Sequence, residues 1–239
     1  MPENKIFCAI DKSEMDESQE LISKIAPVTG AIKFGLEFFN AQGPQGIESL
    51  MESVSQAEFF IDLKYHDIPN TVSRSIKALT EHFGKSRSPA YLNLHCTGGE
   101  DMMKAARQAC PSETRLLGVT ILTSMDQEML RVCGFNGSVT DNVRRLAAIA
   151  KKSGLDGVVC SAHEIRDIRE ECGDDFELMV PGIRPQNSDN QDQKRVMTPC
   201  EAIQAGASHL VIGRPITGHT DPARAAKNIL QEIKRGGAI

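Results

Sequence analysis

The chain has 239 residues, of which 40% are hydrophobic and 25% charged, as in ordinary globular proteins. This length fits one large α/β domain or two small ones. The net charge of −5, with no basic stripe along the chain, argues against nucleic acid or an anionic membrane as the main partner, because phosphate groups need clustered cations.

The seven cysteines are scattered and form no Cys-x-x-Cys pair, so the sequence indicates neither a zinc site nor a redox pair. Several of them lie in apolar runs, where a thiol behaves as a small hydrophobic group, and this usage fits a reducing compartment. No signal-peptide pattern and no apolar run of membrane-spanning length is present. We therefore expect a soluble cytoplasmic protein without membrane contact.

Short apolar runs alternate with amphipathic segments from end to end. The apolar runs predict strands at Ile6–Asp11, Ala31–Phe34, Glu58–Leu63, Tyr91–His95, Leu116–Leu122, Gly157–Ser161, Glu177–Val180 and His209–Gly213. The amphipathic segments predict helices at Glu14–Ala26, Pro44–Val54, Pro69–Phe83, Gly99–Ala109, Val139–Lys152, Glu164–Glu171, Pro199–Ala205 and Pro222–Lys234, and a further short one at Asp126–Val132.

About eight strand–helix pairs in a chain of this size are typical of a (β/α)₈ TIM barrel. The alternative is a doubly wound open sheet, but its Gly-x-Gly-x-x-Gly turn is missing after the first strand. No change of composition divides the chain. We therefore predict a single barrel domain over residues 1–239.

Charged residues fall at the ends of the first three predicted strands. Side chains alternate across a strand, so Asp11, Lys33, Asp62 and Lys64 are all expected on the inner face, near the carboxyl ends of their strands. Active sites of barrels are built at this end. One interpretation is a structural cluster of ion pairs that closes the barrel mouth. The other is a functional site, which the coincidence of three strand ends favours.

Asp67 follows three residues after Lys64 and also has two interpretations. With Pro69 at the first helical position, Asp67 lies near a helix N-terminus, where a carboxylate is favourable without any further role. It can equally belong to the charged cluster.

The last two strands carry the features of an anion site. Arg184 follows the seventh strand and Gly213-Arg214 the eighth, and barrels often bind phosphate in the loops at these positions. A glycine turn beside an exposed arginine is the plainer interpretation. The wholly polar segment 184–195 is either a solvated surface loop or a binding loop at the same end.

The run Asp62-Leu-Lys-Tyr-His-Asp-Ile-Pro-Asn-Thr71 resembles the signature of the orotidine 5′-phosphate decarboxylase family in its bacterial-type, monofunctional form. A bare Asp-x-Lys-x-x-Asp is shared with sugar-phosphate enzymes of a related barrel group, but the Ile-Pro-Asn-Thr continuation is more specific. The similarity covers nearly the whole chain. It includes Ala9–Asp11, Ile32–Lys33, Leu94–His95, Gly98–Gly99, Val119–Ser124, Pro181–Arg184, Gln193 and Gly213–Thr217.

The resemblance implies a carboxy-lyase that converts orotidine 5′-phosphate to uridine 5′-phosphate (UMP) in pyrimidine biosynthesis. It also implies a homodimer with sites at the subunit interface, and no metal or organic cofactor.

The resemblance assigns a role to each matching residue. Lys33, Asp62, Lys64 and Asp67 are expected to form the catalytic network, with Lys64 as proton donor and Asp67 contributed by the partner subunit. The substrate-binding residues that it implies are Asp11 and the partner's Thr71 at the ribose, Thr123 and its neighbour Ser124 at the pyrimidine, and Arg184, Gln193, Gly213 and Arg214 at the phosphate.

Two other functions remain open from the sequence. A magnesium-dependent sugar-phosphate decarboxylase or aldolase of the same barrel group would share the Asp-x-Lys-x-x-Asp pattern, although no additional metal-binding carboxylate is evident after the first strands. A phosphate-binding barrel without enzymatic activity would need the phosphate elements but not two lysines alternating with acids.

Overall fold

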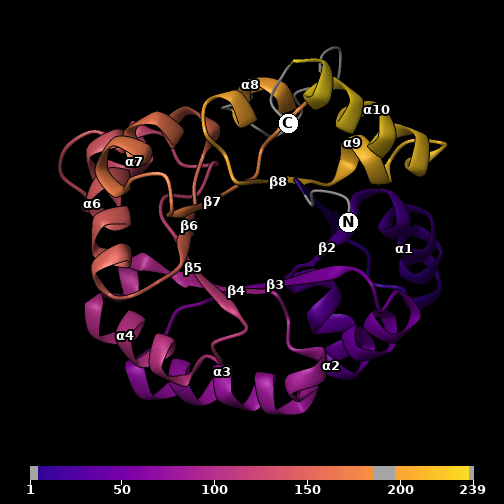
Figure 1. Ribbon diagram of the computed structural model, residues 1–239. Coiled ribbons are helices and arrows are strands. Elements are labelled where there is room, and N and C mark those ends of the chain that lie inside the picture. Colours follow the sequence, from indigo (N-terminus) through magenta and orange to yellow (C-terminus); the bar gives the residue numbers. More distant parts are fainter. Residues whose placement is uncertain (1–4, 186–196, 237–239) are drawn as a thin grey trace.

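The computed structural model describes residues 5–185 and 197–236. Within these residues, eight parallel strands in sequential order close into a barrel, and helices surround it (Figure 1). The strands are β1 Ile6–Ile10, β2 Ala31–Phe34, β3 Glu58–Tyr65, β4 Tyr91–His95, β5 Arg115–Val119, β6 Gly157–Val159, β7 Glu177–Val180 and β8 His209–Ile212. The predicted (β/α)₈ barrel is thereby confirmed.

Helices follow the strands along the chain and cover the outside of the barrel (Figure 1). The α-helices are α1 Met15–Thr29, α2 Leu36–Ser53, α3 Pro69–Phe83, α4 Glu100–Ala109, α5 Gln127–Val132, α6 Val139–Lys152, α7 Ile165–Cys172, α8 Pro199–Gln204, α9 Arg214–Thr217 and α10 Pro222–Arg235. Short 3₁₀ turns occur at Lys85–Arg87, Cys96–Gly98 and Ala162–Glu164. The ring closes where α10 packs beside α1 (Figure 1).

The structure corrects some predicted limits. Helix α2 begins at Leu36 rather than Pro44, because the chain turns helical directly after Gly35 and is interrupted at Gly43, where φ is 67°. Strands β5 and β6 end at Val119 and Val159, earlier than predicted, and α9 was not predicted. Strand β3 is two residues longer than predicted and ends at Tyr65.

Two apolar clusters fill the molecule, as strand alternation requires. One lies between the strands and the helices, where Phe59 and Ile61 of β3 are buried. The other fills the barrel interior and consists of Phe7, Ala9, Ala31, Phe60, Tyr91, Leu117, Val119, Val159, Met179 and Val211. The interior is thus a packed core rather than a pore.

A polar network lies at the amino-terminal end of the barrel, below this core. The hydroxyl of Tyr91 accepts a hydrogen bond from Arg115 at 2.7 Å and lies 3.1 Å from Nε2 of His209. Glu177 approaches the same His209 nitrogen at 3.2 Å. Tyr91, Arg115, Glu177 and His209 are each the first residue of their strands. Residues at the amino-terminal end of a barrel contribute to stability, whereas active sites lie at the carboxyl ends of the strands.

Candidate active site

Four charged side chains meet at the carboxyl ends of β1, β2 and β3, as predicted from the sequence. Lys33 lies within β2 and is only 6% exposed, and Asp62 within β3 is 8% exposed. Asp11 follows β1 at the mouth of the barrel, where its side chain is 54% exposed. The cluster therefore runs from the rim into the barrel.

Asp62 lies between two ammonium groups. Its Oδ1 accepts a hydrogen bond from Nζ of Lys64 at 2.5 Å, and its Oδ2 lies 3.2 Å from Nζ of Lys33. Lys33 also approaches Oδ1 of Asp11 at 3.7 Å. Buried charges are costly unless they are paired, and each of the two buried groups here has an opposite charge within reach.

The environment holds Asp62 in its ionised form. Burial by itself raises the pKa of the carboxyl. The positive charges of Lys33 and Lys64, and hydrogen bonds from Lys64 and Asn93, outweigh that effect and lower the pKa of Asp62 to about 2. Asp62 is thus a carboxylate at any physiological pH.

Lys64 has an unusual backbone. Its φ is 50°, the only positive φ of a non-glycine residue in the described part of the chain. A lysine in this region costs about 1–3 kcal/mol, and residues held in such conformations cluster at functional sites. The surroundings must therefore stabilise the backbone at Lys64.

A bulge in β3 explains this conformation. Ile61 pairs with Leu92 of β4, and Tyr65 pairs with Leu94, so four steps along β3 correspond to two steps along β4. Such irregularities re-aim side chains and are frequent beside active sites. The regular alternation of side chains along β3 is interrupted here, yet Asp62 and Lys64 line the same cavity as Phe60.

Asn93 is part of this arrangement and was not predicted from the sequence. It is the β4 residue opposite the bulge and is fully buried. Its Oδ1 accepts from the backbone N–H of Lys64 at 2.8 Å, and its Nδ2 donates to Oδ1 of Asp62 at 2.6 Å. The available signal was an amide between Tyr91 and His95 on the inward face of the strand.

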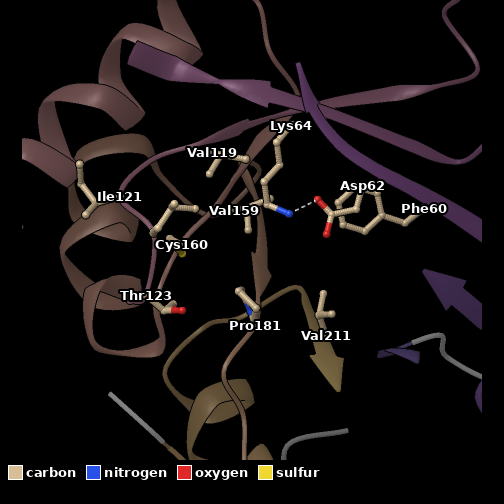
Figure 2. A pocket seen from close by; sticks show the side chains of 11 residues that line it. Phe60, Asp62, Lys64, Val119, Ile121, Thr123, Val159, Cys160, Pro181 and Val211 are labelled. Atoms are coloured by element: carbon tan, nitrogen blue, oxygen red, sulfur yellow. Dashed lines mark hydrogen bonds and ion pairs between the residues drawn. The ribbon is translucent and has the colours of Figure 1, made fainter. Parts of the chain in front are cut away.

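A cavity of about 190 Å³ opens beside the Asp62–Lys64 pair. Figure 2 shows Lys64 and Asp62 directed toward each other at one side of the cavity, with Thr123 and Pro181 on other sides. Most of the lining is apolar. The full lining consists of Phe60, Asp62, Lys64, Val119, Ile121, Leu122, Thr123, Val159, Cys160, Pro181 and Val211.

Two glycines leave room at the rim of the site. A Cβ on Gly35 would lie 3.0 Å from Nζ of Lys33, and one on Gly213 would lie 3.5 Å from Oδ2 of Asp11. Gly213 therefore lies beside Asp11, and the predicted phosphate element at the end of β8 adjoins the charged cluster. The next residue, Arg214, is exposed and begins α9.

Two predicted site residues, Asp67 and Thr71, lie outside this cluster. Asp67 is exposed, and its Oδ1 accepts from the N–H of Ile68 at 2.7 Å; among the described residues no ion pair joins it to the cluster of Asp11, Lys33, Asp62 and Lys64. Thr71 is exposed on α3.

The side chain of Arg184 is buried, and its Nη1 donates to the carbonyl of Ile183. The backbone N–H of Arg184 donates to the carbonyl of Met197 at 3.1 Å. This bond joins described residues on either side of residues 186–196. Gln193, predicted at the phosphate, lies outside the described residues.

The geometry places an ammonium group at the edge of an apolar cavity, with a carboxylate beside it. In an environment of low polarity such an ammonium can stabilise negative charge that develops on a ligand, and it can also deliver a proton. In the part of the chain that the structure describes, no three His, Cys, Asp or Glu side chains group as metal ligands would. No helix in the described ranges is long and apolar enough to cross a lipid bilayer.

Comparisons with known proteins agree with each other. The family model described as "Orotidine 5′-phosphate decarboxylase / HUMPS family" matches residues 4–229. The orotidine 5′-phosphate decarboxylase of Rhodospirillum rubrum is 48% identical over 98% of this chain and 95% of its own length. That of Moorella thermoacetica is 43% identical over 97% and 92%.

A solved structure shows the same similarity. The crystal structure of orotidine 5′-phosphate decarboxylase from Lactobacillus acidophilus superposes with a TM-score of 0.82 at 34% identity, covering 95% of this chain and 98% of the other.

Proposed function

The chain belongs to the orotidine 5′-phosphate decarboxylase / HUMPS family, and we infer that its reaction is the conversion of orotidine 5′-phosphate to UMP in pyrimidine biosynthesis. The chain is a carboxy-lyase. The observation that carries this function is the Lys64–Asp62 pair, which sits beside the apolar cavity on a barrel that matches decarboxylases over nearly its whole length.

We propose that the pyrimidine ring of the substrate occupies the cavity. A volume of about 190 Å³ is below the roughly 300–1,000 Å³ of pockets that hold a whole drug-sized ligand, so it suits the ring alone. Thr123 would contact the polar edge of the ring, as would its neighbour Ser124. The ribose and phosphate would then extend toward the rim, where Asp11 and Gly213 adjoin each other.

Lys64 is the proposed proton donor. When the C6–carboxylate bond breaks, its electron pair stays on C6 as a vinyl-type carbanion and carbon dioxide leaves. The ammonium of Lys64 stabilises this charge, which exists mainly in the transition state, and then transfers one proton to C6 to give UMP. The neutral amine regains its proton from solvent, so the reaction consumes one proton per turnover.

Asp62 and Lys33 support Lys64. The low pKa of Asp62 keeps it ionised, so it holds the Lys64 ammonium at 2.5 Å and lies where the substrate carboxylate must be accommodated. Positioning of the Lys64 ammonium is therefore the role that the geometry supports for Asp62.

Lys33 neutralises Asp62 from the opposite side and lies between Asp62 and Asp11. The Lys33 ammonium therefore occupies the position between Asp11 and Asp62 that a divalent cation bound by both carboxylates would take. This arrangement favours a mechanism without a metal ion at this cluster over the magnesium-dependent sugar-phosphate reaction.

We propose that the phosphate binds near the ends of β7 and β8. Arg214 at the start of α9 offers a guanidinium for bidentate contacts, and the turn at Gly213 brings a backbone N–H near the anion. Arg184, at the base of the polar segment, and Gln193 within it are assigned to the same group by their resemblance to family residues.

We also propose that the enzyme is a homodimer in which Asp67 and Thr71 complete the partner's site. Both side chains are exposed, and Ile68 between them exposes 65% of its surface. Packing of this segment against a second copy would remove the apolar surface of Ile68 from water, which is favourable. Asp67 from a second copy would then extend the alternation of Lys33, Asp62 and Lys64.

The cytoplasm is the proposed location of the enzyme. No disulfide joins the seven cysteines, all of which lie in the described residues and five of which are buried, and this fits a reducing compartment.

A spectrophotometric assay with orotidine 5′-phosphate tests the function directly. We expect stoichiometric UMP formation and competitive inhibition by added UMP. UMP binding without turnover would indicate a binding barrel, and turnover of sugar phosphates alone would contradict the proposal.

A further inference from the structure

We propose that Asn93 is a positioning residue for Lys64 and Asp62, and that its side-chain amide sets the geometry in which the Lys64 ammonium meets the substrate. This inference rests on the function proposed above. Asn93 contributes no charge and does not line the cavity, so it acts through the two residues that it bonds.

The two hydrogen bonds of Asn93 fix the orientation of its amide. An N–H can only donate and a carboxylate can only accept, so Oδ1 must face Lys64 and Nδ2 must face Asp62. The side chain must therefore carry one acceptor and one donor on the same carbon atom at the end of a short stem. Only an amide of this length meets that requirement without adding charge to the cluster.

The first bond stabilises the unusual backbone of Lys64. The bulge in β3 takes the Lys64 N–H out of the regular ladder, and Oδ1 of Asn93 replaces the missing β4 partner at 2.8 Å. Because φ at Lys64 is positive, this residue would relax toward an ordinary strand conformation if that bond were lost. Relaxation would turn the Lys64 side chain away from its present direction.

The second bond fixes the carboxylate that holds the ammonium. Oδ1 of Asp62 accepts from both Asn93 at 2.6 Å and Lys64 at 2.5 Å. One amide therefore fixes Lys64 at two places: at its backbone directly, and at its Nζ through Asp62. The bulge in β3 and the side-chain amide of Asn93 together orient the Lys64 side chain toward the cavity.

Replacement of Asn93 by leucine, which has a similar shape but no polar atoms, removes both hydrogen bonds and tests their role. Misplacement of a reacting group by about 1 Å costs on the order of 10²-fold in rate. We therefore expect kcat of Asn93→Leu to fall by about 10²-fold, while the dissociation constant for UMP changes less than about threefold because the ring and phosphate contacts remain.

Asn142→Leu is the matched control. Asn142 is also fully buried, but its amide donates to the carbonyls of Asn136 and Ser138 at the start of α6, outside the cavity. This variant should lower the unfolding midpoint and keep kcat within about twofold of the wild type. A kcat of Asn93→Leu within threefold of the wild type would overturn the proposal.

Asn93→Asp tests the second bond through the pH dependence of kcat. A purely structural role of Asn93 would leave this pH dependence unchanged. The new carboxylate can still accept from the Lys64 N–H, but when ionised it has no donor for Asp62 and repels it. Asn93 bonds Asp62 and Lys64 of β3, which connect to Lys33 of β2 and through it to Asp11. His95 on β4 also interacts with Asp62 and Lys64, and His66 adjoins His95. A proton shared by the two carboxyls restores the donor, and such pairs titrate together.

The ratio of kcat for Asn93→Asp to that of the wild type should therefore rise as pH falls from 8 to 5, by up to about tenfold per pH unit. A ratio independent of pH would contradict the role of the second bond. If Asn93→Leu does not fold, Asn93→Asp still tests the proposal, because aspartate keeps the side-chain volume of asparagine and the oxygen that accepts from the Lys64 N–H. If the wild type itself does not convert orotidine 5′-phosphate, the proposed function fails; if it does and the variants match it, only this inference fails.

Discussion

Replacing Asp62 by asparagine removes the negative charge that two ammonium groups share and keeps the size of the side chain. The structure sets the magnitude of the effect. Lowering the pKa of Asp62 from 3.8 to about 2 corresponds to about 2 kcal/mol of folding free energy when the carboxyl is ionised. Among the described residues, Lys33, at 6% exposure, would then retain an ion pair only with Asp11, at 3.7 Å. Removing one partner of a buried pair costs about 3–5 kcal/mol.

We therefore expect Asp62→Asn to lower the free energy of unfolding by about 2–5 kcal/mol at pH 7. The pH dependence has a definite sign. A carboxyl whose folded-state pKa is lowered contributes its full stability above its usual pKa of 3.8, and loses it as pH falls toward about 2. The gap between wild type and Asp62→Asn should be constant from pH 5 to 8 and should narrow below about pH 4.

Urea denaturation of both proteins at a series of pH values measures this gap. Glu20→Gln is the control, because it removes an exposed charge paired with Lys24 at 2.6 Å and should leave the unfolding midpoint nearly unchanged. An Asp62→Asn protein as stable as the wild type, or a gap that does not change between pH 5 and 3, would refute the account of the charged cluster.

Three further outcomes are expected. Mixed dimers of Asp62→Ala with Asp67→Ala subunits should regain one native site each, and verified heterodimers without activity would exclude the shared site. Turnover should survive exhaustive chelation, whereas a loss that magnesium reverses would favour the sugar-phosphate alternative. Gly35→Ala should lower kcat about tenfold without unfolding the protein, because its Cβ would lie 3.0 Å from Nζ of Lys33 and displace it; unchanged kcat would show that the exact place of Lys33 is unimportant.

The barrel and its charged mouth followed from sequence because both depend on local patterns. Apolar runs mark buried strands, and alternation assigns Lys33 and Asp62 to the inner face. Element limits were harder to predict. Pro44 looked like a helix start, yet it begins only the second part of α2, after the break at Gly43. No side-chain cap marks the true start at Gly35.

The positioning of Lys64 could not be predicted in this way. Whether β3 bulges depends on its register against β4, which is a long-range property that no local pattern records. Asn93 has its significance only in that register. Asp67 poses a different difficulty, because its proposed partners belong to a second copy of the chain, and one sequence does not specify how two copies meet.

The central claim is that Lys64 stabilises the carbanion and protonates it, and steady-state turnover of orotidine 5′-phosphate by Lys64→Ala tests it most directly. General acid catalysis contributes about 10²–10⁴-fold and electrostatic stabilisation at least about 10²-fold, so kcat should fall by at least about 10⁴-fold in a folded protein. Lys77→Ala, on the exposed face of α3, should keep wild-type activity. A folded Lys64→Ala enzyme with a kcat within tenfold of the wild type would contradict the account.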